Sequence, residues 1–250
     1  MSGDEKKQQI QRSGDSAQRQ PIFLLPTAVT VLCGLLIAIQ AADSLVLNES
    51  GRSVLLNWFA FVPYRALHPE AFDGSWLPLL WTPITHAFLH GGWEHVILNT
   101  VWLAIFATPV TQRYGAGRML VVFLAGAALG ALAFALTTIG QLQVLVGASG
   151  GIAGLTGVAV RFIFQPPVVV VDPDTGERVA VGRHLATFSQ FVRNPTARFF
   201  ALTWIVLNGV VPLLPLLMGS DAIQIAWQSH LAGFLAGFFI APLLERGHRD

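Results

Sequence analysis

The sequence predicts an all-α, polytopic membrane protein whose core is a bundle of six membrane-spanning helices. Two observations support this prediction: the composition is unusually apolar, and six apolar stretches approach the length that crosses a bilayer. Of the 250 residues, 53% are hydrophobic and 12% are charged, whereas soluble domains carry about 25% charged residues. The formal net charge of +1 gives no basic field for nucleic acid, which we do not expect as a partner. The single cysteine, Cys33, allows neither an internal disulfide nor a cysteine metal cluster.

Six segments approach the roughly 20 apolar residues that a helix needs to cross the hydrocarbon core. They are Ile22–Ala42, Trp93–Val110, Met119–Leu136, Gly150–Phe164, Phe199–Leu217 and Ile225–Leu244. The fourth reaches this length only when it is extended outward through Val144–Ser149. The first is longer than the core of a signal peptide and no clean A-x-A site follows it, so we expect a membrane anchor rather than a cleaved signal.

The basic residues indicate the orientation. Six spans place both ends of the chain on one side, and 13 of the 15 Lys and Arg residues fall on that side. They are Lys6, Lys7, Arg12, Arg19, Arg113, Arg118, Arg161, Arg178, Arg183, Arg193, Arg198, Arg246 and Arg249. Because cytoplasmic loops are enriched in Lys and Arg, we expect both termini in the cytoplasm. Residues 1–20 are then a polar cytoplasmic tail, residues 21–245 the membrane domain and residues 246–250 a second tail.

Two connections between the spans are long. The outer one, residues 43–92, is rich in tryptophan, phenylalanine and proline, a composition typical of chain that lies at a membrane interface. The inner one, residues 165–197, contains the runs Val168–Val171 and Val179–Val181 on either side of an Asp-Pro-Asp-Thr-Gly turn sequence. Two β-branched runs around such a turn predict a small cytoplasmic hairpin.

Polar side chains inside a membrane are costly and are candidates for function. Three polar groups stand near the starts of the even-numbered spans. They are His86, His90, His95 and Asn99 at the second span, Gly147-Ala148-Ser149-Gly150 at the fourth, and His230 at the sixth. With the N-terminus inside, every even-numbered span begins on the outer side. The three groups therefore lie at a similar depth and predict one site that opens toward the extracytoplasmic side.

Ser149 stands at the start of a helix, where a serine commonly serves only as an N-cap. The same position offers free backbone N–H groups and a positive dipole end that stabilise a developing oxyanion. The neighbouring Gly147 and Gly150 allow a substrate to approach the backbone closely. Ser149 is thus a candidate nucleophile as well as a candidate cap.

His230 shares a helical face with Gly233 and Gly237. Small residues spaced four apart let membrane helices pack closely, and the fourth span carries its own small-residue stripe. Docking these stripes brings His230 toward Ser149, where it can act as a general base, although a histidine here can also be a structural hydrogen-bonding group. We see no carboxylate near His230 in the sixth span, so we expect a dyad rather than a triad.

His95 and Asn99 are four residues apart and therefore lie on one helical face. Both side chains can donate hydrogen bonds to the oxygen of a reacting carbonyl. The alternative is that they join neighbouring helices, as polar side chains often do in membranes.

Together these motifs resemble those of the rhomboid intramembrane serine proteases. The matching motifs are His90-Gly91-Gly92-Trp93-Glu94-His95-x-x-x-Asn99, Gly147-Ala148-Ser149-Gly150 and Ser229-His230-Leu231-Ala232-Gly233-x-x-x-Gly237. They occur in the family's order, on the second, fourth and sixth spans, and the resemblance covers roughly Ser75–Leu244.

The resemblance implies that Ser149 is the nucleophile and His230 the base. It further implies that His95, Asn99 and the backbone N–H of Ser149 form an oxyanion hole, with His86 and His90 in structural or hydrogen-bonding roles. The implied substrates are single-span membrane proteins, which are cut without a cofactor or a metal. The compact six-span core suggests a bacterial plasma membrane as the location, with an organelle membrane as the alternative.

Three positions depart from patterns that are common in this family. Thr82 follows Trp81 where many members have arginine, Thr111 stands where glutamate is common, and Ala153 stands where some members place an aromatic ring against the catalytic histidine. If the family mechanism applies, another group has to orient His230.

Three other functions agree less well with the sequence. His86, His90 and Glu94 have the spacing of metal ligands on a helix, but Gly91-Gly92 interrupts that helix and no His-Glu-x-x-His motif is present. A catalytically silent relative that binds or escorts membrane clients typically lacks the serine or the histidine, and this chain has both. A transporter is disfavoured because no acidic residue lies well inside any predicted span.

Overall fold

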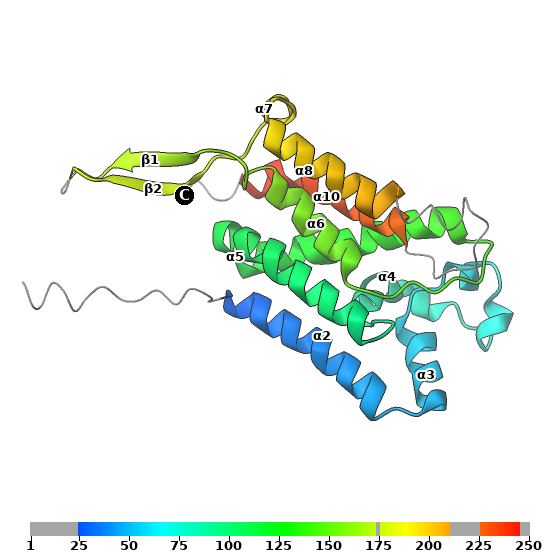
Figure 1. Cartoon of the computed structure of the whole chain (residues 1–250). Helices are drawn as coiled ribbons and strands as arrows, with labels where there is room; N and C mark the ends of the chain where they lie inside the picture. The colour runs from blue at the N-terminus through cyan, green and yellow to red at the C-terminus, as the bar shows by residue number, and fades with distance from the viewer. Residues whose placement is uncertain (1–24, 174–175, 211–225, 246–250) are drawn as a thin grey trace, which may run out of the picture.

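The computed structural model describes residues 25–173, 176–210 and 226–245 and is mostly helical (Figure 1). The longer helices are α2 (Thr27–Leu45), α3 (Glu49–Phe59), α5 (Trp93–Thr138), α6 (Ser149–Val160), α8 (Pro195–Ile205) and α10 (Trp227–Glu245). The shorter ones are η1 (Pro63–Ala66), η2 (Pro69–Phe72), η3 (Leu77–Leu80), α4 (Thr82–Thr85), η4 (His86–Phe88), α7 (Phe188–Arg193) and η5 (Val206–Val210). The predicted tails at residues 1–20 and 246–250 lie outside the described residues.

Helix α5 contains both the second and the third predicted spans, because it consists of two limbs that meet at Gly115. Gly115 has φ 81° and ψ 165°, a conformation that ends a helix and that favours glycine. In the first limb His95 lies against Gly147, and in the second limb Thr137 accepts a hydrogen bond from Gln228. The start of the first limb therefore lies beside the start of α6, and the end of the second limb lies beside the start of α10. The two limbs run antiparallel (Figure 1).

Helix α6 is shorter than the fourth predicted span. Its 12 residues cover about 18 Å at 1.5 Å per residue, compared with about 30 Å of hydrocarbon. All its residues from Gly150 to Val160 are buried, and the chain reaches the helix through Gly147 and Ala148, which are also buried. Non-helical backbone is tolerated at membrane depth where protein surrounds it, so α6 can remain short in the centre of the bundle.

Glycines allow α6 and α10 to touch backbone to backbone. A Cβ atom added to Gly233 would overlap the carbonyl oxygen of Gly150, and one added to Gly237 would overlap that of Gly154. From the other side, a Cβ atom on Gly157 would overlap the carbonyl oxygen of Phe234. This close approach is the small-residue packing that membrane helices use, and it fixes the position of His230 relative to Ser149.

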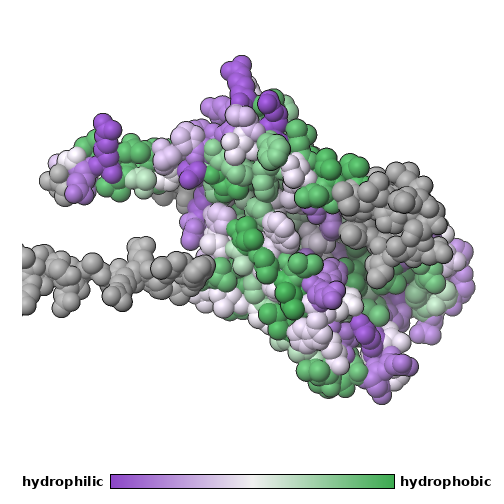
Figure 2. All heavy atoms as spheres, in the orientation of Figure 1, coloured by the Kyte–Doolittle hydropathy of each residue, from purple (hydrophilic) through white to green (hydrophobic). Residues whose placement is uncertain are grey.

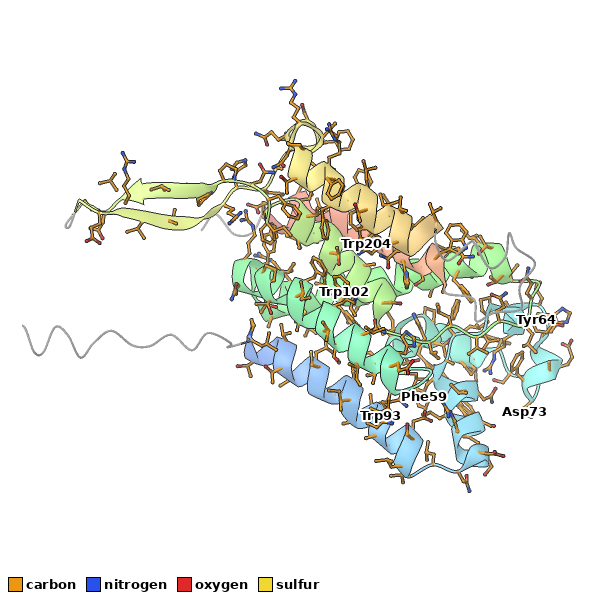
Figure 3. All side chains as sticks on the ribbon, in the orientation of Figure 1. Phe59, Tyr64, Asp73, Trp93, Trp102 and Trp204 are labelled. Atoms are coloured by element: carbon orange, nitrogen blue, oxygen red, sulfur yellow. The ribbon has the colours of Figure 1, made fainter. Side chains whose placement is uncertain are left out.

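The fifth predicted span corresponds to α8 followed by the π-helical segment η5. The helix begins at Pro195, four residues before the predicted start at Phe199, because Asn194 caps it by accepting hydrogen bonds from two backbone N–H groups. Trp204 (Figure 3) of α8 stacks on Phe234 of α10 with ring centroids 4.7 Å apart. Residues 211–217 of this predicted span, and Ile225 at the start of the sixth, lie outside the described residues.

Within the described ranges, α2, α5 and α10 are long and apolar enough to cross a membrane. Large apolar side chains are exposed on the outside of the bundle, for example Leu98 at 60%, Leu132 at 59% and Phe199 at 72%, and hydrophobic atoms extend over the helices in Figure 2. Such a surface suits lipid rather than water. The chain is an integral membrane protein, and the count of six spans stays a prediction.

The segment between α6 and α8 carries two strands, β1 (Pro167–Val171) and β2 (Arg178–Arg183), which pair antiparallel. The register shifts between Val168 and Val169, and opposite this irregularity Gly182 adopts φ 139°. Every strand residue is exposed, and the hairpin projects from one end of the bundle (Figure 1). The turn residues 174–175 are not among those described.

The outer connection is folded into α3 and several short helices. The indole rings of Trp58 and Trp81 stack with centroids 6.1 Å apart, and Nε1 of Trp81 donates to the carbonyl oxygen of Trp58 at 2.7 Å. Thr85 donates to the carbonyl oxygen of Phe59 (Figure 3) at 2.8 Å. These contacts tie α3 to α4 and so hold the chain that leads into His86 and His90.

Candidate active site

The side chains of Ser149 and His230 meet between α6 and α10. Nε2 of His230 lies 2.8 Å from Oγ of Ser149, within hydrogen-bonding distance. Ser149 is the first residue of α6, after the N-cap residue Ala148, and no side-chain capping hydrogen bond is found there. Among the described contacts, the serine hydroxyl is directed to the histidine rather than used as a helix cap.

The second ring nitrogen of His230, Nδ1, has no hydrogen bond of good geometry within the described part of the chain. The polar group that faces the ring there is the backbone of Asn208, in the π-helical segment η5. Gly209 of the same segment packs against the side chain of Leu231, which keeps η5 next to the start of α10. Ala153, at the position where an aromatic ring could contact the histidine, is buried and lies against Gly233. No aromatic side chain is therefore present there, and the backbone of η5 is the polar group near the ring.

His95 lies over the loop that leads into Ser149. A Cβ atom on Gly147 would be 2.8 Å from Nε2 of His95, and Gly147 has φ 121°, so glycine is required there for two reasons. Nδ1 of His95 accepts a hydrogen bond from the N–H of Gly91 at 3.4 Å. In a neutral ring this leaves the proton on Nε2, the nitrogen that faces the loop.

Asn99 lies one turn further along α5 and is buried. Its Nδ2 donates to the carbonyl oxygen of His95 at 2.9 Å, which fixes the amide. Because an amide nitrogen carries two N–H groups, the second remains available as a donor. The structure thus brings His95 next to the Ser149 loop, with Asn99 one turn further along the same helix.

His86 and His90 hold the backbone just before Ser149. The carbonyl oxygen of His86 accepts from the N–H of Gly147 at 3.0 Å, and Nε2 of His90 accepts from the N–H of Ala148 at 3.4 Å. Burial lowers the pKa of His86 to about 4. Burial, with the nearby His95, lowers the pKa of His90 to about 3. Both rings are therefore neutral near pH 7 and can accept hydrogen bonds.

The lowered pKa values of these two histidines predict that the protein loses stability in mild acid. In the unfolded chain His86 has its ordinary pKa of 6.5, whereas the folded value is about 4. The unfolded state therefore binds the proton first. The contribution of neutral His86 to the free energy of unfolding is complete above pH 6.5 and decreases as the pH falls toward 4. The expected loss from His86 is about 3 kcal/mol, which thermal unfolding between pH 7.5 and 4.5 measures.

The matched variants for this pH dependence are His86→Asn and His68→Gln. Asparagine does not titrate and can keep the hydrogen bond that Nδ1 of His86 makes with the carbonyl oxygen of Thr82. We expect a clearly shallower pH dependence in His86→Asn and a much smaller change in His68→Gln, since the side chain of His68 is 41% exposed and pairs with Glu70 at the surface. An equal pH dependence in wild type and His86→Asn would show that His86 does not contribute.

One residue near the site, Asn208, was missed in the sequence, and Ser229 was noted only as part of the motif around His230. Asn208 takes part through its backbone, and the irregular helix that presents it has no recognisable sequence pattern. Ser229 is buried between Gly130 and Gly150, and the residue before a proposed base gave no separate signal. As for the metal alternative, no group of three His, Cys, Asp or Glu residues gathers as ligands in the described ranges.

Comparison with known proteins gives a consistent family relationship. The family model described as the rhomboid domain matches residues 78–172. The chain is 32% identical over 211 residues to "Rhomboid protease GluP" of Bacillus subtilis, covering 84% of this chain and 34% of that protein. It is 30% identical over 136 residues to "Rhomboid protease GlpG" of Yersinia enterocolitica, covering 53% of this chain and 43% of that protein.

A plant relative carries a name that states no activity. The chain is 27% identical over 164 residues to "RHOMBOID-like protein 5" of Arabidopsis thaliana, covering 66% of this chain and 44% of that protein. The matched region thus spans less than half the length of each of these three relatives. The matched residues include the Ser149 loop, which lies within the rhomboid domain.

Proposed function

The chain belongs to the rhomboid family, and from this premise we propose that it is an intramembrane serine endopeptidase. It hydrolyses peptide bonds in or near the transmembrane segments of single-span membrane proteins. Ser149 is the nucleophile and His230 is the general base. The observation that carries the proposal is the 2.8 Å contact between Oγ of Ser149 and Nε2 of His230, two residues that are 81 positions apart in the chain.

The proposed reaction begins when Oγ of Ser149 attacks the carbonyl carbon of the scissile bond. Nε2 of His230 takes the hydroxyl proton and returns it to the leaving amine, which gives an acyl-enzyme. A water molecule then attacks the ester, with the same nitrogen accepting its proton, and releases Ser149. For Nε2 to accept a proton, the ring proton has to reside on Nδ1, where the backbone carbonyl of Asn208 is the group available to hold it.

The proposed oxyanion hole consists of the backbone N–H of Ser149, Nε2 of His95 and Nδ2 of Asn99. The start of α6 contributes unpaired N–H groups and a positive dipole end. The tautomer of His95 set by Gly91 supports a donor role for Nε2. Gly147, whose φ of 121° only glycine adopts readily, leaves space for the substrate carbonyl beside that ring.

In the proposed arrangement, α2, the two limbs of α5, α6, α8 with η5, and α10 are the six spans. Both termini are cytoplasmic, and the dyad opens to the extracytoplasmic side of a bacterial plasma membrane. The basic residues of the α5 turn and of the hairpin segment support this orientation, because they gather at the end of the bundle opposite the dyad.

Incubation of the purified protein with a single-span membrane substrate in detergent tests this function. We expect the wild type to cleave a bond in or next to the transmembrane segment and Ser149→Ala to cleave nothing, with both proteins folded equally well. The panel includes several substrates with small residues and helix-weakening residues near the membrane boundary. Equal cleavage by both proteins would overturn the assignment of Ser149 as the nucleophile. Binding without cleavage across the panel would instead favour a silent relative that escorts membrane clients.

A further inference from the structure

A cavity of about 700 Å³ lies at the end of the bundle opposite the dyad, between the helices and the base of the hairpin. Its volume is typical of small-molecule binding sites. Six lining residues matter here: Pro109, Gln112 and Arg113 of α5, Phe162 just beyond α6, and Val181 and Arg183 of β2. The cavity is thus formed by three separate parts of the chain.

The cavity carries positive charge that the described residues do not fully balance. Arg113 is paired with Glu245 at 2.7 Å. Arg183 donates to the carbonyl oxygens of Ile163 and Gln165, but it takes part in none of the ion pairs found in the described ranges. No acidic residue lines the cavity among those described. A ligand with a negative group is therefore electrostatically favoured.

Apart from His184, the remaining wall of the cavity is apolar, and it continues onto the lipid-facing side of α5. Trp102 (Figure 3) and Ile105 are about half exposed, at 46% and 50%. Their spacing from Pro109 and Gln112 places all four on one helical face. A ligand held in the cavity can therefore extend an apolar tail along this stripe. A free phosphate ion would use only the polar part of such a site.

We propose that this cavity binds the headgroup of an anionic phospholipid. The phosphate is held by the guanidinium of Arg183 and the side-chain amide of Gln112, and the acyl chains follow the Trp102 stripe. Basic pockets on the cytoplasmic side of membrane proteins bind such headgroups. The hairpin provides one wall, because Arg113 also donates to the carbonyl oxygen of Arg183. This proposal does not depend on proteolytic activity.

The test titrates short-chain phosphatidylglycerol into the purified full-length protein in a neutral detergent and records the unfolding midpoint. A ligand that binds the folded state raises the midpoint until the site is saturated. We expect this response with phosphatidylglycerol but not with phosphatidylcholine or inorganic phosphate. Arg183→Gln should raise the half-saturating concentration about tenfold, which is the usual contribution of one charged hydrogen bond to binding. Arg178→Gln, at the far end of the same strand, should not change it.

Gln112→Glu provides a second variant that breaks no hydrogen bond seen in the described residues. It places a carboxylate in the cavity and should also raise the half-saturating concentration about tenfold. The proposal is overturned if phosphatidylcholine or inorganic phosphate produces the same response as phosphatidylglycerol. It is equally overturned if Arg183→Gln and Gln112→Glu both respond like the wild type.

Discussion

Replacing Gly237 by alanine is expected to destabilise the folded protein by more than about 3 kcal/mol. The added Cβ atom would overlap the backbone carbonyl oxygen of Gly154, and a backbone atom in a packed helix cannot move aside as a flexible side chain can. Overpacking a well-packed core commonly costs 1–3 kcal/mol, and a clash with backbone lies at or above the upper end of that range. Denaturant or thermal unfolding in detergent measures the loss.

Gly34→Ala is the matched control for this substitution. Gly34 lies in α2, where an added Cβ atom meets nothing within 4 Å, so alanine should be neutral or stabilise the protein by up to about 1 kcal/mol. Equal stability of Gly237→Ala and Gly34→Ala would mean that α6 and α10 are not in backbone contact. The separation of Ser149 and His230 would then no longer be fixed by the glycines.

Replacing His230 by glutamine is expected to slow substrate cleavage by about 10⁴-fold while leaving the protein folded. Glutamine has a similar size but cannot take the proton of Ser149, and a positioned general base contributes up to about 10⁴-fold to a rate. The measurement is the initial rate of cleavage of one single-span substrate by equal amounts of folded protein. His68→Gln, on an exposed segment of the outer connection, should cleave at the wild-type rate.

A modest effect of His230→Gln would contradict the assigned role. A decrease of less than tenfold would mean that another group activates the serine or that the reaction does not use this hydroxyl. The unfolding midpoint of each variant, recorded in the same detergent, separates loss of catalysis from loss of fold.

The meeting of Ser149 and His230 was predictable from the sequence. The predicted alternation of six spans places the starts of the even-numbered spans at one depth, the basic residues predict which side of the membrane that is, and the glycines near His230 predict a close helix contact. Each of these signals depends on the chemistry of the bilayer, which restricts charge, helix length and packing far more than water does. The exposed hairpin strands also lie where β-branched runs flank a turn sequence.

Other features depend on tertiary contacts and could not be predicted. The short α6 is tolerated only because neighbouring helices bury all of it, and hydropathy cannot distinguish a buried helix from one that faces lipid. The π-helical segment η5 has no sequence pattern, so the group that faces Nδ1 of His230 could not be named in advance. The earlier start of α8 depends on Asn194 and Pro195, a capping pair inside what reads as a loop.

Mass spectrometry of the protein after treatment with a fluorophosphonate tests the central claim most directly. This reagent phosphonylates a serine hydroxyl that a neighbouring base activates, without requiring knowledge of the natural substrate. We expect a single adduct per chain, located on Ser149, absent from Ser149→Ala and formed far more slowly in His230→Gln. No adduct on folded wild-type protein, or labelling of Ser149 at the same rate in His230→Gln, would contradict the claim.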